Sequence, residues 1–172
     1  EDVRVPAKNA VGEVNRGWYI GTTTLDFERS SIGASVNQRQ TIDRNVAWMR
    51  ANRALIRDGA YESVRTAWAG RAVETQVLTM LSYRIISMQA AGQVPNSEAS
   101  IAKLFNSELS QRIASTSMAI LGMAGQLRTA DAPFAGEIPA DYLFNVAMTI
   151  AGGTSEIQRG IIATRGLGLP RG

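Results

Sequence analysis

Glu28 is the first side chain in this sequence whose position could support catalysis. It follows Leu25 by three residues and precedes Ile32 by four, so on a helix it lies on the apolar stripe that these residues form. No cation lies three or four residues away to pair with it. Burial without a partner raises the pKa of a carboxyl group toward the range of about 6–7 that suits a general base. The alternative is a carboxylate at the edge of the stripe that contacts water or an arginine from another helix.

Two glycines before a short helix form the second candidate site. Gly152 and Gly153 are followed by Thr154, Ser155 and Glu156, and the backbone N–H groups at the start of a helix, together with its dipole, bind anions. The simpler interpretation is a tight turn in which Thr154 or Ser155 caps the helix. The spacing is not that of a P-loop or a dinucleotide-binding fingerprint, so both interpretations stay open.

The composition restricts the remaining chemistry. The 172 residues include no cysteine and no histidine, which excludes thiolate nucleophiles, disulfides, Ser-His-Asp triads and metal sites built from those ligands. We therefore expect no metal ion. Any reaction has to use carboxylates, arginines, hydroxyl groups, backbone groups or a cofactor.

The charge and hydropathy patterns favour neither nucleic acid nor a membrane as a partner. Arg supplies 16 of the 18 basic residues and is scattered along the chain, and aromatic residues are only 6%. No apolar run approaches the roughly 20 residues that span a bilayer. The N-terminus has neither an initiator Met nor a signal-peptide pattern, so we expect a cytoplasmic protein of which this chain is a fragment.

Helical periodicity predicts three long helices. One is expected over residues 15–57, where no proline occurs. A second follows the break at Asp58 and Gly59, which Asp58 could cap, and a third runs from Asn96 or Ser97 to Gly122. The side chains expected on their apolar faces are Trp18, Leu25, Ile32, Val36, Val46 and Met49, then Val64, Trp68, Leu78, Leu81, Ile85 and Met88, and then Ile101, Leu104, Phe105, Ile113, Met118 and Leu121.

Two shorter helices complete the predicted fold. One is expected over residues 140–150, and the last runs from Thr154 or Ser155 to about residue 165. With short connections, these helices predict an all-α, antiparallel (up-down) four-helix bundle with a short C-terminal helix. We expect residues 1–14 to be an extended linker and residues 15–172 to form the helical domain.

Several motifs resemble the acyl-CoA dehydrogenase family. The run Ile150–Arg159, IAGGTSEIQR, is similar to the C-terminal signature of that family, and Leu167–Pro170 looks like its usual C-terminal tail. Leu25–Arg29 resembles the start of the family's substrate helix, and Ser100–Leu104 resembles its third helix. Stretches within residues 2–18 are similar to the strand exit and loop that precede its C-terminal domain. The resemblance covers nearly the whole chain.

The resemblance implies that the chain is the C-terminal helical bundle of an FAD enzyme. Such enzymes dehydrogenate the α,β-bond of an acyl-CoA: a Glu removes an α-proton, hydride passes to the flavin, and electron-transfer flavoprotein is the implied electron acceptor. Most members place the base two residues before the signature Thr, which here is Gly152, and glycine cannot act as a base. A minority place it on the first bundle helix directly before an Arg. That position is Glu28, which precedes Arg29.

The same resemblance assigns the remaining site residues. Asp26 and Arg29 would line the substrate channel. Gly152 would polarise the thioester carbonyl through its backbone N–H, and Gly153 would lie beside the thioester. The residues against the flavin would be Thr154, Ser155 and Glu156.

Two residues that the family lends to a neighbouring subunit's flavin are missing. The expected Arg falls on Ala54 or Leu55, and an expected Gln falls on Ala119. This departure resembles the heteromeric acyl-CoA dehydrogenases of actinobacterial sterol side-chain breakdown, in which two different chains share each flavin site. The alternatives are a homotetramer in which Arg53 or Arg57 replaces the missing Arg, a non-catalytic scaffold subunit, and a same-fold flavin monooxygenase.

Assembly of the family into tetramers through this domain implies an apolar outer face. A bundle of this size has more large apolar side chains than its core needs. The candidates for that face are Trp48, Trp68, Met80 and Met88.

Overall fold

Six α-helices make up most of residues 2–28, 32–56 and 59–170, which are the residues that the computed structural model describes; of residues 25–28 it describes the backbone alone. None of these residues forms a strand. The helices are α1 (Gly17–Glu28), α2 (Ile32–Ala51), α3 (Ala60–Ala90), α4 (Asn96–Leu121), α5 (Glu137–Ala147) and α6 (Ser155–Ile161).

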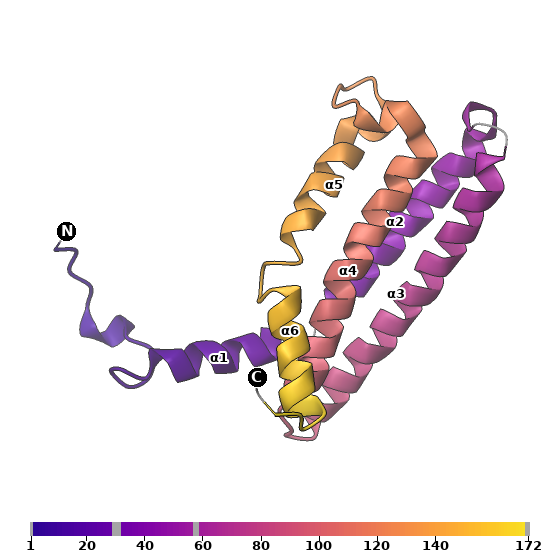
Figure 1. Cartoon of the computed structure of the whole chain (residues 1–172). Coiled ribbons are helices and arrows are strands. Elements are labelled where there is room, and N and C mark those ends of the chain that lie inside the picture. Colours follow the sequence, from indigo (N-terminus) through magenta and orange to yellow (C-terminus); the bar gives the residue numbers. More distant parts are fainter. Residues whose placement is uncertain (1, 29–31, 57–58, 171–172) are drawn as a thin grey trace.

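The helices form an up-down bundle. Figure 1 shows α2, α3 and α4 side by side in alternating directions, with α5 and then α6 running back along α4 as the fourth member. The predicted all-α antiparallel bundle is therefore confirmed.

The long helix predicted over residues 15–57 is wrong at its C-terminal end. α2 ends at Ala51, where the side-chain amide of Asn52 donates a hydrogen bond to the carbonyl of Trp48 at 2.9 Å. A 3-10 turn, Arg53–Leu55, follows. Because of this turn Ile56 is buried among the core residues instead of continuing along the helix surface. Asp58, the predicted cap of the next helix, lies outside the described residues.

The same prediction is also wrong about continuity. α1 and α2 are assigned as separate helices, and Figure 1 shows α1 leaving the bundle along a different axis. Trp18, which we expected on the apolar face, is 79% exposed. None of the described side chains of α1, residues 17–24, is therefore part of the core.

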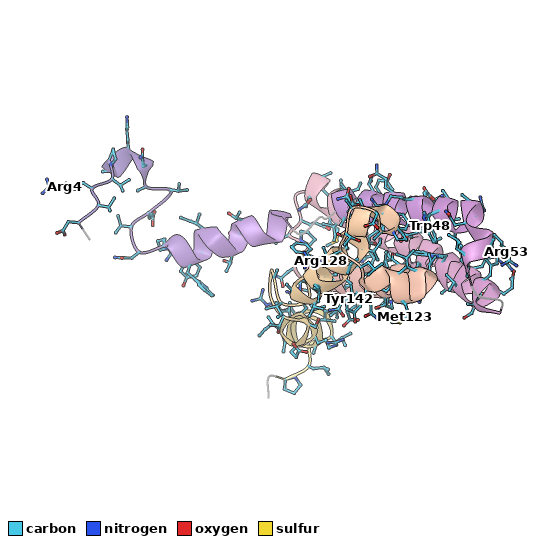
Figure 2. All side chains as sticks on the ribbon, turned by 90° about the horizontal axis from the view of Figure 1, so that it is seen from above. Arg4, Trp48, Arg53, Met123, Arg128 and Tyr142 are labelled. Atoms are coloured by element: carbon cyan, nitrogen blue, oxygen red, sulfur yellow. The ribbon has the colours of Figure 1, made fainter. Side chains whose placement is uncertain are left out.

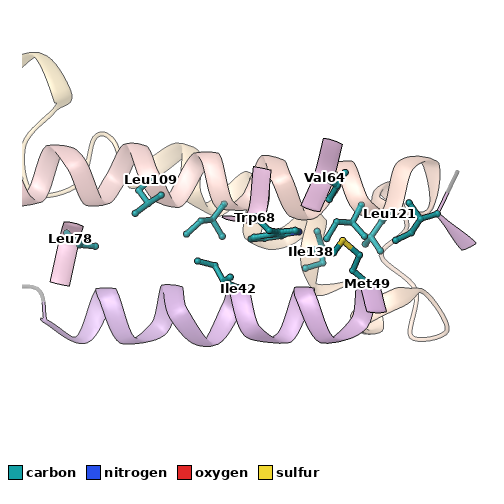
Figure 3. Close-up of a cluster of buried hydrophobic side chains, with 11 residues drawn as sticks. Ile42, Met49, Val64, Trp68, Leu78, Leu109, Leu121 and Ile138 are labelled. Carbon is teal, nitrogen blue, oxygen red and sulfur yellow. The ribbon is translucent and has the colours of Figure 1, made fainter. Parts of the chain in front are cut away.

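The core lies between α2, α3 and α4, and α5 covers one end of it. Figure 3 shows Trp68 of α3 between α2 and α4, near Ile42 and Ile138. Burying a large apolar side chain contributes about 1.5–3 kcal/mol, so this cluster provides much of the bundle's stability. Its members are Ile42, Met49, Ile56, Val64, Trp68, Leu78, Leu109, Ile113, Ile120, Leu121 and Ile138.

The buried face of α2 is more polar than predicted. Ile32 and Val36 are exposed, whereas Gln38 and Asn45 are buried. The amide of Gln38 donates to the Ser110 hydroxyl of α4 at 3.0 Å. Hydrogen bonds of this kind offset the cost of removing amides from water, so a face that carries them can still pack inward.

The shorter elements begin where local chemistry allows. α5 starts at Glu137, three residues earlier than predicted, because Pro139 lies in the first turn, where a missing N–H costs nothing. α4 starts after Pro95 without a side-chain cap, so neither Asn96 nor Ser97 caps it. Within the described ranges, no helix is both long and apolar enough to cross a membrane.

Candidate functional site

The Gly152–Gly153 loop joins α5 to α6 and has a backbone that favours glycine. Both residues have positive φ, +68° and +99°. Residues other than glycine adopt this region of backbone conformation only with steric strain. A methyl group added at Gly153 would lie 2.6 Å from Nε2 of Gln158. Glycine is therefore favoured at position 153 by the backbone conformation, and a larger residue there would displace the amide of Gln158.

Both carbonyl groups of this loop are bonded to side chains of the bundle. Nε2 of Gln158 donates to the Gly152 carbonyl at 3.0 Å, and Nζ of Lys103, on α4, donates to the Gly153 carbonyl at 2.6 Å. In the described part of the chain, no acceptor bonds to the N–H of Gly152 or Gly153. The loop can therefore donate to a ligand oxygen, as an oxyanion site does.

The three residues after the glycines have different roles in the structure. Thr154 caps α6, and its hydroxyl accepts from the N–H of Ile157 at 3.3 Å. Ser155 is buried and Glu156 is exposed. Hydrogen bonds, first from its own backbone N–H and then from the Thr154 hydroxyl, lower the pKa of the Glu156 carboxyl group. The capping interpretation of this turn is confirmed, and it is compatible with anion binding at the preceding loop.

A polar groove of about 640 Å³ lies beside this turn, between α3, α4 and α6. Ser155 and Glu156 line it together with Arg71, Arg112 and Arg159. In the sequence each of these arginines is an ordinary helix-surface residue. They belong to three separate helices, so their spacing does not indicate that they are neighbours. Only the packing of those helices brings them together.

The arginines of this groove are only partly satisfied by acidic neighbours. Glu74 pairs with Arg71 at 2.6 Å and with Arg112 at 3.0 Å, and Glu108 pairs with Arg159. The Nε atoms of Arg71 and Arg112 are buried and make no hydrogen bond, although Nε of Arg112 lies 3.0 Å from a carboxylate oxygen of Glu74. These Nε atoms are enclosed by the protein and cannot reach a ligand, whereas the partly exposed side chains of the three arginines line the groove and can face an anionic or polar ligand.

The predicted substrate residues lie where the described part of the chain is interrupted. Glu28 is the last residue of α1, and the side chains of Glu28 and Asp26 are outside the described residues, as is all of Arg29. Ile32 and Val36, which continue the apolar stripe used to single out Glu28, are exposed. The part of the stripe that lies on α2 therefore does not face the core.

The positions where the family's flavin-binding Arg and Gln are missing lie on the surface. Leu55 and Ala119 are exposed. Arg53 is also exposed, with its guanidinium 3.7 Å above the ring centre of Tyr61, and Figure 2 shows it at the edge of the bundle farthest from α1. Arg57 is outside the described residues.

The predicted outer face is wrong for Trp68, which is buried in the core. Trp48 is half-buried and packs on Phe134, with ring centres 5.6 Å apart. Met80 is 58% exposed. The apolar surface of α3 instead forms a groove of about 450 Å³ lined by Val73, Gln76, Val77, Met80, Leu81 and Arg84.

Residues 15–167 match the family described as "Acyl-CoA dehydrogenase, C-terminal domain". With the helical bundle and the glycine loop in place, this match establishes that the chain belongs to the acyl-CoA dehydrogenase family.

Several known proteins and solved structures are similar to this chain over nearly its whole length. The chain is 31% identical over 181 residues to "Acyl-CoA dehydrogenase FadE26" of Mycobacterium tuberculosis, covering 99% of this chain and 44% of that protein. Of the solved structures, "Tcur3481-Tcur3483 steroid ACAD" is similar with a TM-score of 0.86 and 30% identity over 100% of this chain and 44% of that one. The ChsE4-ChsE5 complex from Mycobacterium tuberculosis is similar with a TM-score of 0.82 and 31% identity, covering 99% and 45%. The chain thus spans less than half the length of these relatives.

Proposed function

We propose that this chain is the C-terminal domain of an FAD-dependent acyl-CoA dehydrogenase that oxidises the α,β-bond of an acyl-CoA thioester. The observation that supports it best is the Gly152–Gly153 loop, whose carbonyls are bonded to the bundle while its N–H groups have no acceptor in the described chain. Membership of the family supplies the reaction class.

The residues of this chain divide the reaction between them. The Gly152 N–H donates to the thioester oxygen, which stabilises the negative charge that develops as the α-proton leaves. Glu28 receives that proton on its carboxylate, Asp26 and Arg29 line the substrate channel, and Gly153 lies beside the thioester. FAD, when bound, supplies the oxidant that accepts the hydride from the β-carbon.

The groove beside α6 is the proposed contact with the cofactor. Thr154, Ser155 and Glu156 lie against the flavin in this proposal. The partly exposed side chains of Arg71, Arg112 and Arg159, which line this groove, suit its polar groups. Electron-transfer flavoprotein is the proposed acceptor of the electrons.

We further propose that the enzyme assembles with a paralogous subunit. The missing Arg at Ala54 or Leu55 and the missing Gln at Ala119 would leave a neighbour's flavin pyrophosphate without its cationic partner. Similarity to a complex of two chains, ChsE4-ChsE5, supports this assembly. The apolar groove on α3 is the surface proposed to pack in the tetramer.

Producing the complete protein alone is expected to give flavin-poor or insoluble material, because two negative charges without a cation weaken cofactor binding. Co-expression with a paralogue that carries the missing Arg should give a yellow complex with two copies of each chain and acyl-CoA-dependent flavin bleaching. Gel filtration with flavin absorbance measures both. A soluble homotetramer full of FAD contradicts the heteromer and indicates Arg53 or Arg57 as the substitute. A flavin-loaded complex that no acyl-CoA bleaches contradicts the proposed reaction.

A further inference from the structure

Lys103 reaches the Gly152–Gly153 loop from a different helix. Only two lysines occur in the chain, Lys8 and Lys103. Nζ of Lys103 lies 2.6 Å from the Gly153 carbonyl, and its Cε lies 3.8 Å from where a Cβ of Gly152 would be. Its charge is therefore close to both glycines. A charged donor forms a stronger hydrogen bond than a neutral one.

Gln158 bonds to the other side of the same loop. It is fully buried, with 0% of its surface exposed, and its Nε2 donates to the Gly152 carbonyl at 3.0 Å. Its Nε2 also occupies the space that a Cβ on Gly153 would need. The loop is thus bonded on one side to α4 and on the other to α6.

These two bonds restrain the peptide units of the loop, and so the directions in which its N–H groups point. A peptide unit is planar and trans, so its carbonyl and the following N–H point in opposite directions. Holding the carbonyls of Gly152 and Gly153 therefore orients the N–H groups of Gly153 and Thr154. It also limits rotation about the backbone bonds of Gly152, and with it the direction of the Gly152 N–H. Glycines have the greatest backbone freedom, so side-chain bonds have to supply this restraint.

We propose that Lys103 and Gln158 are positioning residues that hold the Gly152–Gly153 loop in the conformation that donates to the thioester oxygen. The inference rests on the proposed dehydrogenation for its chemistry, but the restraint on the loop can be measured without any turnover.

The first test measures amide hydrogen exchange of residues 150–157 in the complete protein. Lys103→Met should speed exchange in this loop by about tenfold or more, because a local opening is no longer opposed by the bond. Lys8→Met, a substitution of the other, exposed lysine, should leave it unchanged. Unchanged exchange in the Lys103 variant overturns the proposal whatever the enzyme does. If circular dichroism shows that Lys103→Met has lost helix content, the measurement is made on Lys103→Gln instead, which keeps a hydrogen-bond donor without the charge.

The second test uses the flavin-loaded assembly and separates positioning from simple attachment of α6. Lys103→Met should lower kcat by about 10–100-fold, as loss of a residue supporting an active group does, with KM changed by less than about threefold. In the same Lys103→Met variant, the infrared C=O stretch of a bound thioester analogue should move toward its value in water. Lys103→Arg should restore most of the kcat and most of the wild-type stretching frequency. If Lys103→Met has the wild-type kcat and the wild-type C=O stretch while Glu28→Gln has lost its activity, the positioning role of Lys103 is overturned. Failure of every acyl-CoA to bleach the flavin of the wild-type assembly instead removes the proposed function.

Discussion

Replacing Glu28 by Gln is expected to lower the rate of acyl-CoA-dependent flavin reduction by about 10²–10⁴-fold, the usual cost of losing a general base. Gln keeps the size and shape of the side chain but cannot accept the α-proton. The Gly at position 152, where most of the family carries its base, leaves this chain no carboxylate at that position. Stopped-flow loss of flavin absorbance in the assembled enzyme measures the effect.

A matched control keeps this result interpretable. Glu13→Gln removes a carboxylate from the exposed segment before α1 and should leave the rate unchanged. Flavin content and substrate binding should be retained in Glu28→Gln, because only the proton acceptor is removed. Bleaching at the normal rate by Glu28→Gln would show that the base lies elsewhere, in another domain or in the partner chain.

Trp68→Ala is expected to lower the free energy of unfolding by about 3–5 kcal/mol, the range for removing a large buried aromatic side chain. Trp68 is 2% exposed and lies in the centre of the core (Figure 3). Domains are stable by only about 5–15 kcal/mol, so this single change removes a large share. Urea unfolding followed by circular dichroism measures it.

Trp68→Phe separates packing from polarity at the same site. Nε1 of Trp68 is buried without a hydrogen-bond partner, and an unsatisfied buried donor costs about 1–3 kcal/mol. Phe keeps most of the ring and removes this N–H, so its cost should be well below that of Ala. An equal loss for Phe and Ala contradicts this account of the core.

Helix type and several boundaries follow from local sequence. The helical periodicity that includes Val64, Trp68, Leu78 and Ile85 predicted α3, and all four are buried. Gly122 after α4 and Thr154 before α6 marked helix ends correctly. Local patterns suffice here because helix propagation and capping depend on residues within one or two turns. The signature from Ile150 to Arg159 likewise indicated the family from residues adjacent in the chain.

The tertiary structure decided which helix faces pack against one another. Trp68 could have faced a partner or the core as far as spacing shows, and packing against α2 and α4 places it inside. Gln38 is buried because Ser110, 72 residues later, accepts its hydrogen bond.

The candidate site depends on the same long-range packing. The sequence by itself determined an all-α chain with a glycine loop ahead of a capped helix. It did not reveal that Lys103, 50 residues earlier, bonds to Gly153, or that Arg71, Arg112 and Arg159 share one groove. Helical periodicity carries no information about contacts between separate helices, since those depend on how the helices pack side chain against side chain. The restraint on the loop and the polar groove therefore exist only in the folded bundle.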